Sequence, residues 1–161
     1  MAINDNLGLN LGQLETALEM ALTCKLGNIK VTPLILEKKV NDRVSQRYIL
    51  FYQISGGLLT NRAGTGSIDC PKAKKVSYEI KFVFHLKDLR SHKRFYDCAD
   101  ELIGLIDGLP LNPPFTQISV TRFSEPTYDD EGGFYEWTIN AKVYGYFRTN
   151  MLQKSPLQSE C

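Results

Sequence analysis

The chain contains 161 residues, of which 43% are hydrophobic and 23% charged, and its 19 basic and 18 acidic side chains leave a formal net charge of +1. This length predicts one domain with a buried core, and the composition argues against a disordered chain. The near-zero charge argues against a protein that coats DNA, and no apolar run approaches the roughly 20 residues of a membrane span. The first ten residues contain no basic segment followed by an apolar one, so we expect no secretory signal.

The first predicted element is a helix over Leu11–Lys25, in which apolar residues recur at intervals of three and four. Asn10 and Gln13 have the spacing of a weak capping box at its start. A strand over Ile29–Leu36 follows. Because Pro33 cannot donate a hydrogen bond to a ladder, we expect this strand at an edge of the sheet.

The second predicted strand, Gln46–Ile54, is apolar on both faces. Such a strand is typically covered on both sides, or has one face in a subunit contact. The next segment, Ser55–Pro71, contains four glycines and few apolar residues, which predicts a long loop.

The clearest strand signal is Val76–Leu86, where apolar and polar residues alternate and predict one face on the core. An amphipathic helix over Ser91–Asp107 comes next and ends before a glycine and several prolines. The remaining elements are a strand over Thr116–Phe123, an acidic turn over Glu125–Gly133 and a long alternating strand over Phe134–Arg148.

The element order is α-β-β-β-α-β-β, with strands in antiparallel runs and no βαβ repeats. It predicts an α+β fold in which a mostly antiparallel sheet of 4–5 strands carries two α-helices on one face. We expect Phe82, Leu102 and Trp137 to lie together between the sheet and the helices. Residues 1–148 should form the single domain, and residues 149–161 a flexible C-terminal tail.

The sequence contains no catalytic, cofactor or metal signature. His85 and His92 accompany no nucleophile motif and are expected to be solvated, and no glycine-rich loop has the phosphate-binding pattern. The four cysteines have no C-x-x-C spacing, and Cys24 and Cys98 are expected as small core residues. We therefore expect a protein that is not an enzyme, with no catalytic residues, cofactor or metal.

Two charged segments are the candidate contact sites. The basic set comprises Arg62, Lys72, Lys74 and Lys75, and the acidic set comprises Glu125, Asp129, Asp130 and Glu131. Opposite charges on one subunit suit a head-to-tail oligomer, whereas two solvated loops with no such role are the simpler interpretation. No nucleic-acid-binding motif accompanies the basic set.

Four segments together resemble the tail-terminator families of long-tailed bacteriophages, most closely the Mu-like minor tail proteins. They are the alternating strand Tyr78–Leu86, the helix Phe95–Pro110 with its L-x-G-x-x-P ending, the Ser124-Glu125-Pro126 corner, and the aspartate- and glycine-containing turn with its aromatic strand, Asp129–Tyr146. Together with an N-terminal helix of matching length, the resemblance covers roughly residues 10–148.

The resemblance implies a structural virion protein with no catalytic residues. Such proteins form a hexameric ring that caps the tail tube, ends tube and sheath polymerisation, and offers a surface for neck or head-completion proteins. The implied partners are five further copies, the tail tube protein, the neck or head-completion protein and, in contractile tails, the sheath protein. DNA would only pass through the ring lumen, and no membrane is involved. The implied location is the virion tail, assembled in the cytoplasm of a host bacterium.

Two alternatives stay open. The first is another ring-forming neck or connector protein of a virion. The second is a small-molecule-binding α+β domain, which would need polar groups converging between sheet and helices. The predicted inward faces are almost wholly apolar, which counts against the second alternative.

Overall fold

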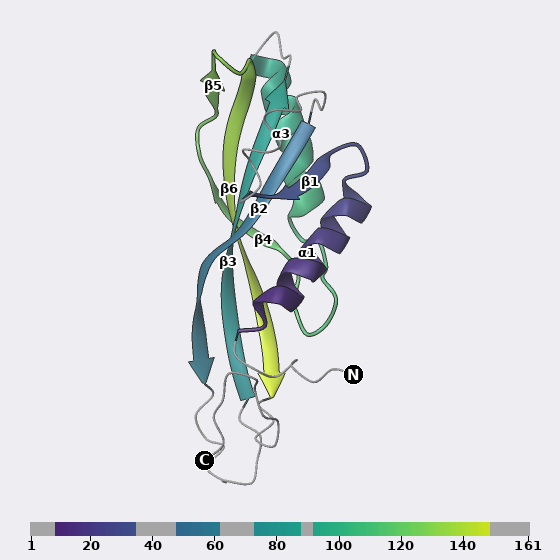
Figure 1. The fold of residues 1–161 in the computed structure, drawn as a ribbon, viewed down its shortest axis with the longest axis vertical. Coiled ribbons are helices and arrows are strands. Elements are labelled where there is room, and N and C mark those ends of the chain that lie inside the picture. Colours follow the sequence, from purple (N-terminus) through teal and green to yellow (C-terminus); the bar gives the residue numbers. More distant parts are fainter. Residues whose placement is uncertain (1–8, 35–47, 62–72, 88–91, 149–161) are drawn as a thin grey trace.

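The structure is a computed structural model that describes residues 9–34, 48–61, 73–87 and 92–148. The predicted C-terminal tail, residues 149–161, lies outside the described residues. The described elements are α1 (Leu11–Lys25), β1 (Lys30–Pro33), β2 (Tyr48–Asn61), β3 (Ala73–Lys87), α3 (His92–Ile106), β4 (Ser119–Phe123), β5 (Thr127–Asp129) and β6 (Phe134–Arg148) (Figure 1).

One mixed sheet contains all six described strands, in the order β1-β2-β3-β6-β4, with β5 also paired to β6. β1 runs parallel to β2, and all other pairs are antiparallel. The predicted α+β class and element order are confirmed, and β1 lies at an edge as its proline required. The sheet has one strand more than expected, because Thr127–Asp129 of the predicted turn folds back and pairs with the start of β6.

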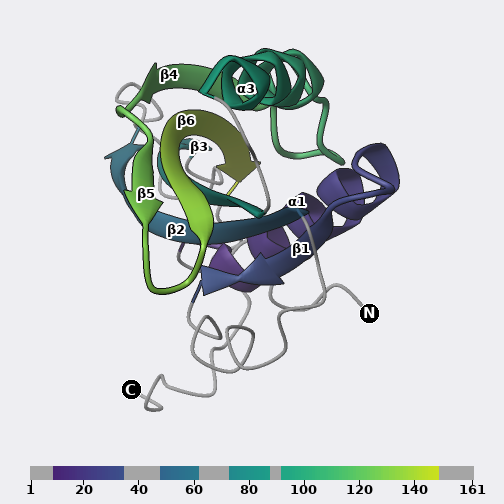
Figure 2. The same cartoon turned by 90° about the horizontal axis from the view of Figure 1, so that it is seen from above.

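Both helices cover the same face of the sheet, as predicted. Seen from above, α1 lies beside β1 and β2 near one edge of the coiled sheet, whereas α3 lies beside β4 at the opposite edge (Figure 2). The alternating apolar residues of β3 and β6 point toward the two helices and form one buried cluster with them. Phe82, Leu102 and Trp137 all belong to this cluster, so their predicted positions are confirmed.

Two tyrosine hydroxyls attach α1 to the sheet. Tyr52 of β2 donates a hydrogen bond to Glu19 Oε2 at 3.2 Å, and Tyr78 of β3 donates one to the Leu9 carbonyl just before the helix. Each hydroxyl leaves water on folding, so these bonds replace the lost solvation. The apolar stripe of α1 is thereby fixed over the central strands.

The predicted cap of α1 and the predicted burial of one cysteine are wrong. Asn10 adopts left-handed angles (φ 54°, ψ 39°) and makes no side-chain cap, whereas a capping side chain needs extended backbone angles. Its Nδ2 atom and Gln13 Oε1 are both buried without a hydrogen-bond partner. Cys24 is exposed, because it lies two residues after Leu22 and therefore points away from the buried stripe, while Cys98 is half-buried.

Because of the buried tyrosines, we expect the free energy of unfolding to decrease at alkaline pH. Burial raises the pKa of Tyr78 to about 12, and burial together with Glu19 also raises the pKa of Tyr52. Between about pH 10 and 12 the unfolded chain therefore loses the Tyr78 proton while the folded chain keeps it. The free energy of unfolding should fall by up to about 1.4 kcal/mol per pH unit from this residue. We expect Tyr78→Phe to lessen that slope in urea denaturation between pH 10 and 12, and an unchanged slope would contradict the assignment.

Candidate subunit-contact surfaces

The acidic residues lie in a corner that is tied to β6. Ser124 donates its backbone N–H to the Thr138 carbonyl at 2.9 Å, and its own carbonyl accepts a 2.6 Å hydrogen bond from Trp137 Nε1. The Thr138 N–H in turn donates to Ser124 Oγ at 3.2 Å. Three hydrogen bonds thus fix the residue that precedes Glu125, so the sequence signature Ser-Glu-Pro corresponds to a fixed corner.

The hairpin between β5 and β6 holds the other three acidic residues. Asp129 Oδ1 accepts hydrogen bonds from the backbone N–H groups of Glu131 at 3.0 Å and Gly132 at 3.2 Å. Asp129 therefore shapes the turn, while Glu125, Asp130 and Glu131 extend into solvent, all four being exposed. The structure thus brings the predicted acidic set together at one end of the sheet.

The basic set is described only in part. Arg62, Lys72 and the side chain of Lys74 lie outside the described part of the chain. Lys75 lies near the start of β3, with its ammonium 4.6 Å from the centre of the Tyr144 ring and 5.9 Å from that of Tyr146. A cation over an aromatic face is attracted by the ring quadrupole, so these rings orient the lysine.

Lys75 and the acidic set lie at opposite ends of the sheet. In the β3–β6 register, Lys75 pairs with Tyr146, and Lys87 pairs with Phe134 beside the acidic hairpin. At about 3.4 Å per residue, the stretch from Lys75 to Lys87 is about 40 Å long. Lys75 therefore cannot reach the acidic hairpin of its own molecule, and only a second molecule could bring such charges together.

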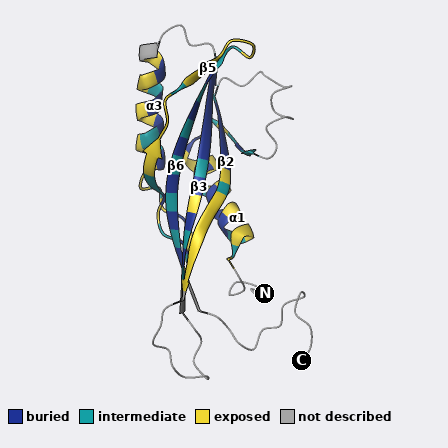
Figure 3. Cartoon of the chain, turned by 90° about the vertical axis from the view of Figure 1, so that its left-hand side faces the viewer, coloured by how far each residue is buried: buried dark blue, intermediate teal, exposed yellow. Residues whose placement is uncertain are grey.

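A strand extension replaces the first part of the predicted Ser55–Pro71 loop, and residues 62–71 lie outside the described residues. β2 continues to Asn61 and pairs with β3 along its whole length, with a bulge between Ile54 and Gly56. Leu58 is 74% exposed and Leu59 is 48% exposed, and Figure 3 shows this half of β2 as exposed. The sequence signal was a Leu-Leu-Thr run after the two glycines. The glycines indicated a loop, but they serve the bulge and a close approach to β3.

This extension leaves strand surface that the described chain does not cover. The lower ends of β2, β3 and β6 run past both helices (Figure 1). In the described chain β1 pairs only with the part of β2 from Ile49 to Tyr52, so the outer edge beyond Tyr52 has no neighbouring strand. Unpaired edges and exposed leucines are features of a surface that associates with other chains.

The prediction of a solvated His85 is wrong. The side chain is buried on the face of the sheet away from the helices, in ring contact with Phe51 (4.8 Å between centres) and Phe134 (4.5 Å). Its Nε2 atom lies 3.0 Å from Glu136 Oε2. The position of His85 on the mostly polar face of the alternating strand suggested exposure, but Phe51 of the adjacent strand covers the imidazole ring. His92 lies at the start of α3, and its side chain is outside the described part.

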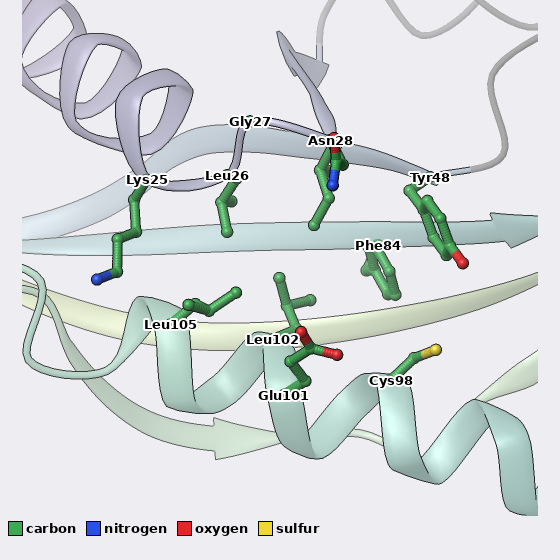
Figure 4. Close-up of a pocket in the computed structure, with 11 residues that line it drawn as sticks. Lys25, Leu26, Gly27, Asn28, Tyr48, Phe84, Cys98, Glu101, Leu102 and Leu105 are labelled. Atoms are coloured by element: carbon green, nitrogen blue, oxygen red, sulfur yellow. The ribbon is translucent and has the colours of Figure 1, made fainter.

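A pocket of about 280 Å³ lies between the α1–β1 connection and α3 (Figure 4). Leu26, Phe84 and Leu102 are among its apolar lining residues, and Lys25 and Glu101 add charges of opposite sign. The almost wholly apolar interior expected from the sequence therefore has a polar rim here. Within the described residues no group of three or more histidine, cysteine, aspartate or glutamate side chains could hold a metal ion.

The helices that the structure describes include none that is long and apolar enough to cross a membrane. The sequence matches no protein-family model and no curated protein. Among solved structures, the chain is similar to one in the "Virion of native gene transfer agent (GTA) particle", with 11% sequence identity and a TM-score of 0.46. That alignment covers 86% of this chain and 100% of the other.

Proposed function

We propose that this chain is a structural virion protein, with no enzymatic activity, that forms a hexameric ring capping the tail tube of a long-tailed phage. The ring would end polymerisation of the tube, and of the sheath in a contractile tail, and would offer a surface for the neck. The observation that carries the proposal is the uncovered extension of β2, together with the resemblance of the Tyr78–Tyr146 segments to tail terminators. The described residues of one chain leave this strand surface open, whereas neighbours in an assembly would cover it.

The decisive experiment removes the apolar character of the extension and examines tails. We expect Leu58→Thr with Leu59→Thr to keep the free energy of unfolding within about 0.5 kcal/mol, because both side chains are exposed and threonine suits a strand. In a phage lacking the wild-type gene, this variant should give tails that are overlong or not joined to heads, as measured by electron microscopy.

The matched control is Met20→Gln, which replaces an exposed apolar side chain on α1 and should restore normal tails. Tails of normal length, capped and joined to heads, in the double threonine variant would contradict a role of the extension in termination. A ring located at the neck but absent from the tube end would favour a connector protein instead.

The charged sets give a second expected outcome. Changing Lys72, Lys74 and Lys75 together to glutamate should weaken self-association, and more strongly at low salt, because the screening length is about 10 Å at 0.1 M and shortens as salt is added. Light scattering after size-exclusion chromatography at 50 and 500 mM salt measures this. The same charge reversal at Lys25 and Lys30, exposed residues at the end of α1 and the start of β1, serves as the control. Wild-type assembly at every salt concentration would show that the basic set is not a contact.

A further inference from the structure

A second pocket, here called the aromatic pocket, lies where the first turns of α3 meet the β5–β6 hairpin. It has a volume of about 300 Å³ and is lined by Phe95, Tyr96, Glu125, Pro126, Tyr128 and Tyr135. Four of its six lining residues are aromatic, and one is a carboxylate. Within the part of the chain that the structure describes, no basic side chain lines it.

The four rings form a continuous chain around the pocket. Tyr128 lies 4.8 Å from Tyr135 between ring centres, Tyr135 lies 5.2 Å from Phe95, and Phe95 lies 6.0 Å from Tyr96. Phe95 and Tyr135 are buried and belong to the core, whereas Tyr96 and Tyr128 are about half exposed. The pocket therefore has a rigid inner side and two outer rings that an incoming group can touch.

The backbone that carries this carboxylate is held beside the rings before any ligand arrives. The hydrogen bonds of Ser124 to β6 fix the backbone next to Glu125, and the ring of Pro126 restricts the backbone after it. Asp130 and Glu131 of the neighbouring hairpin are also exposed. Three carboxylates therefore lie at or near the mouth of the pocket.

Aromatic faces and a carboxylate are complementary to one class of group, a cation that is flat or carries apolar methylenes. The ring quadrupole attracts a guanidinium or ammonium group, and the carboxylate accepts its hydrogen bonds. We propose that the aromatic pocket binds an arginine or lysine side chain from the basic set of a second copy of this chain. Of this set, Arg62, Lys72, Lys74 and Lys75, the structure describes the Lys75 side chain. Lys75 lies about 40 Å along the sheet from this corner, too far to reach its own pocket. The choice of a second copy rests on the proposed ring, whereas the choice of a cation rests on the pocket alone.

The chemistry of the pocket is tested with small probes on the full chain. N-acetyl-arginine methylamide should shift the tyrosine ring resonances in NMR titrations and bind in the millimolar range, as expected of a single side-chain contact. The neutral analogue N-acetyl-norleucine methylamide should cause no saturable shift. Tyr128→Leu and Glu125→Gln should each weaken arginine binding about 2- to 30-fold. Phe123→Leu and Asp130→Asn are the matched controls, because both residues are exposed but neither lines the pocket. Absence of saturable arginine binding, or equal binding by all four variants, overturns the proposal.

The source of the cation is tested by mixing two variants that each lack one side of the contact. The first carries Glu125→Gln and Tyr128→Leu, and the second carries Lys72→Gln, Lys74→Gln and Lys75→Gln. Sedimentation velocity should show reduced self-association of each variant alone, and 1:1 pairs in the mixture through the single intact contact. If the second variant assembles like the wild type, the lysines of a second copy do not supply the cation, and that part of the proposal is overturned. If the wild type forms no oligomer while arginine still binds, the ring fails and the aromatic pocket stands.

Discussion

Replacing Phe82 with alanine is expected to lower the free energy of unfolding by about 3–5 kcal/mol, a large share of the roughly 5–15 kcal/mol that a domain of this size has. Phe82 is fully buried near the middle of β3, in the cluster that joins the sheet to both helices. Truncation would leave a cavity between the sheet and the helices. Urea denaturation monitored by circular dichroism measures the change, and insoluble protein on expression is the extreme form of the same result.

The control is Phe123→Ala, which makes the same chemical change at a ring that is 66% exposed on the edge strand β4. We expect a loss of under about 1 kcal/mol there. An equally small loss at Phe82 would mean that the face of β3 assigned to the core is not the one that packs under the helices.

Gly57→Val is expected to disrupt the lower half of the β2–β3 ladder. A Cβ atom at this position would lie 2.2 Å from the Ser77 carbonyl oxygen and 3.2 Å from the Tyr78 Cα. Both are backbone atoms of the paired strand, so β2 must move away and the pairs beyond the bulge should break. We expect lower stability and, in hydrogen exchange, loss of amide protection at those residues after Gly57 whose N–H groups point toward β3.

Gly56→Ala is the matched control for this substitution. The two glycines are adjacent and have the same φ of 159°, but the nearest atom to a Cβ at Gly56 is the Glu79 side-chain Oε2 at 3.7 Å. A flexible carboxylate at that distance can stay or move at little cost. Equal effects at the two positions would show that the close approach at Gly57 is not what requires glycine there.

The secondary structure was largely predictable because the buried face repeats with a regular period. Alternation placed β3 and β6 and the inward direction of their side chains, and Pro33 placed β1 at an edge. The β2 extension was missed, since glycine indicates a turn and a bulge equally well. β5 was missed because three residues in an acidic segment are too short to show a period.

The candidate contact residues were predictable as charges but not as a site. Sequence reasoning grouped the four carboxylates correctly because they are neighbours along the chain. It could not show that Lys75 and the four carboxylates lie at opposite ends of the sheet, since this follows from the β3–β6 register. It also missed the aromatic pocket, whose rings come from α3, β5 and β6 and meet only after folding.

The full-length pairing of β3 with β6 has a mechanical consequence. Their register runs without interruption from Ala73 opposite Arg148 to Lys87 opposite Phe134. The hydrogen bonds of such a pair are perpendicular to the strands, so tension along the long axis of the molecule would load them together in shear. A subunit held at Lys75 and at the acidic hairpin would therefore resist extension, whereas a sideways pull on the outer edge of β2 would break its hydrogen bonds to β3 one after another. Resistance to extension should depend strongly on the direction in which neighbouring molecules pull.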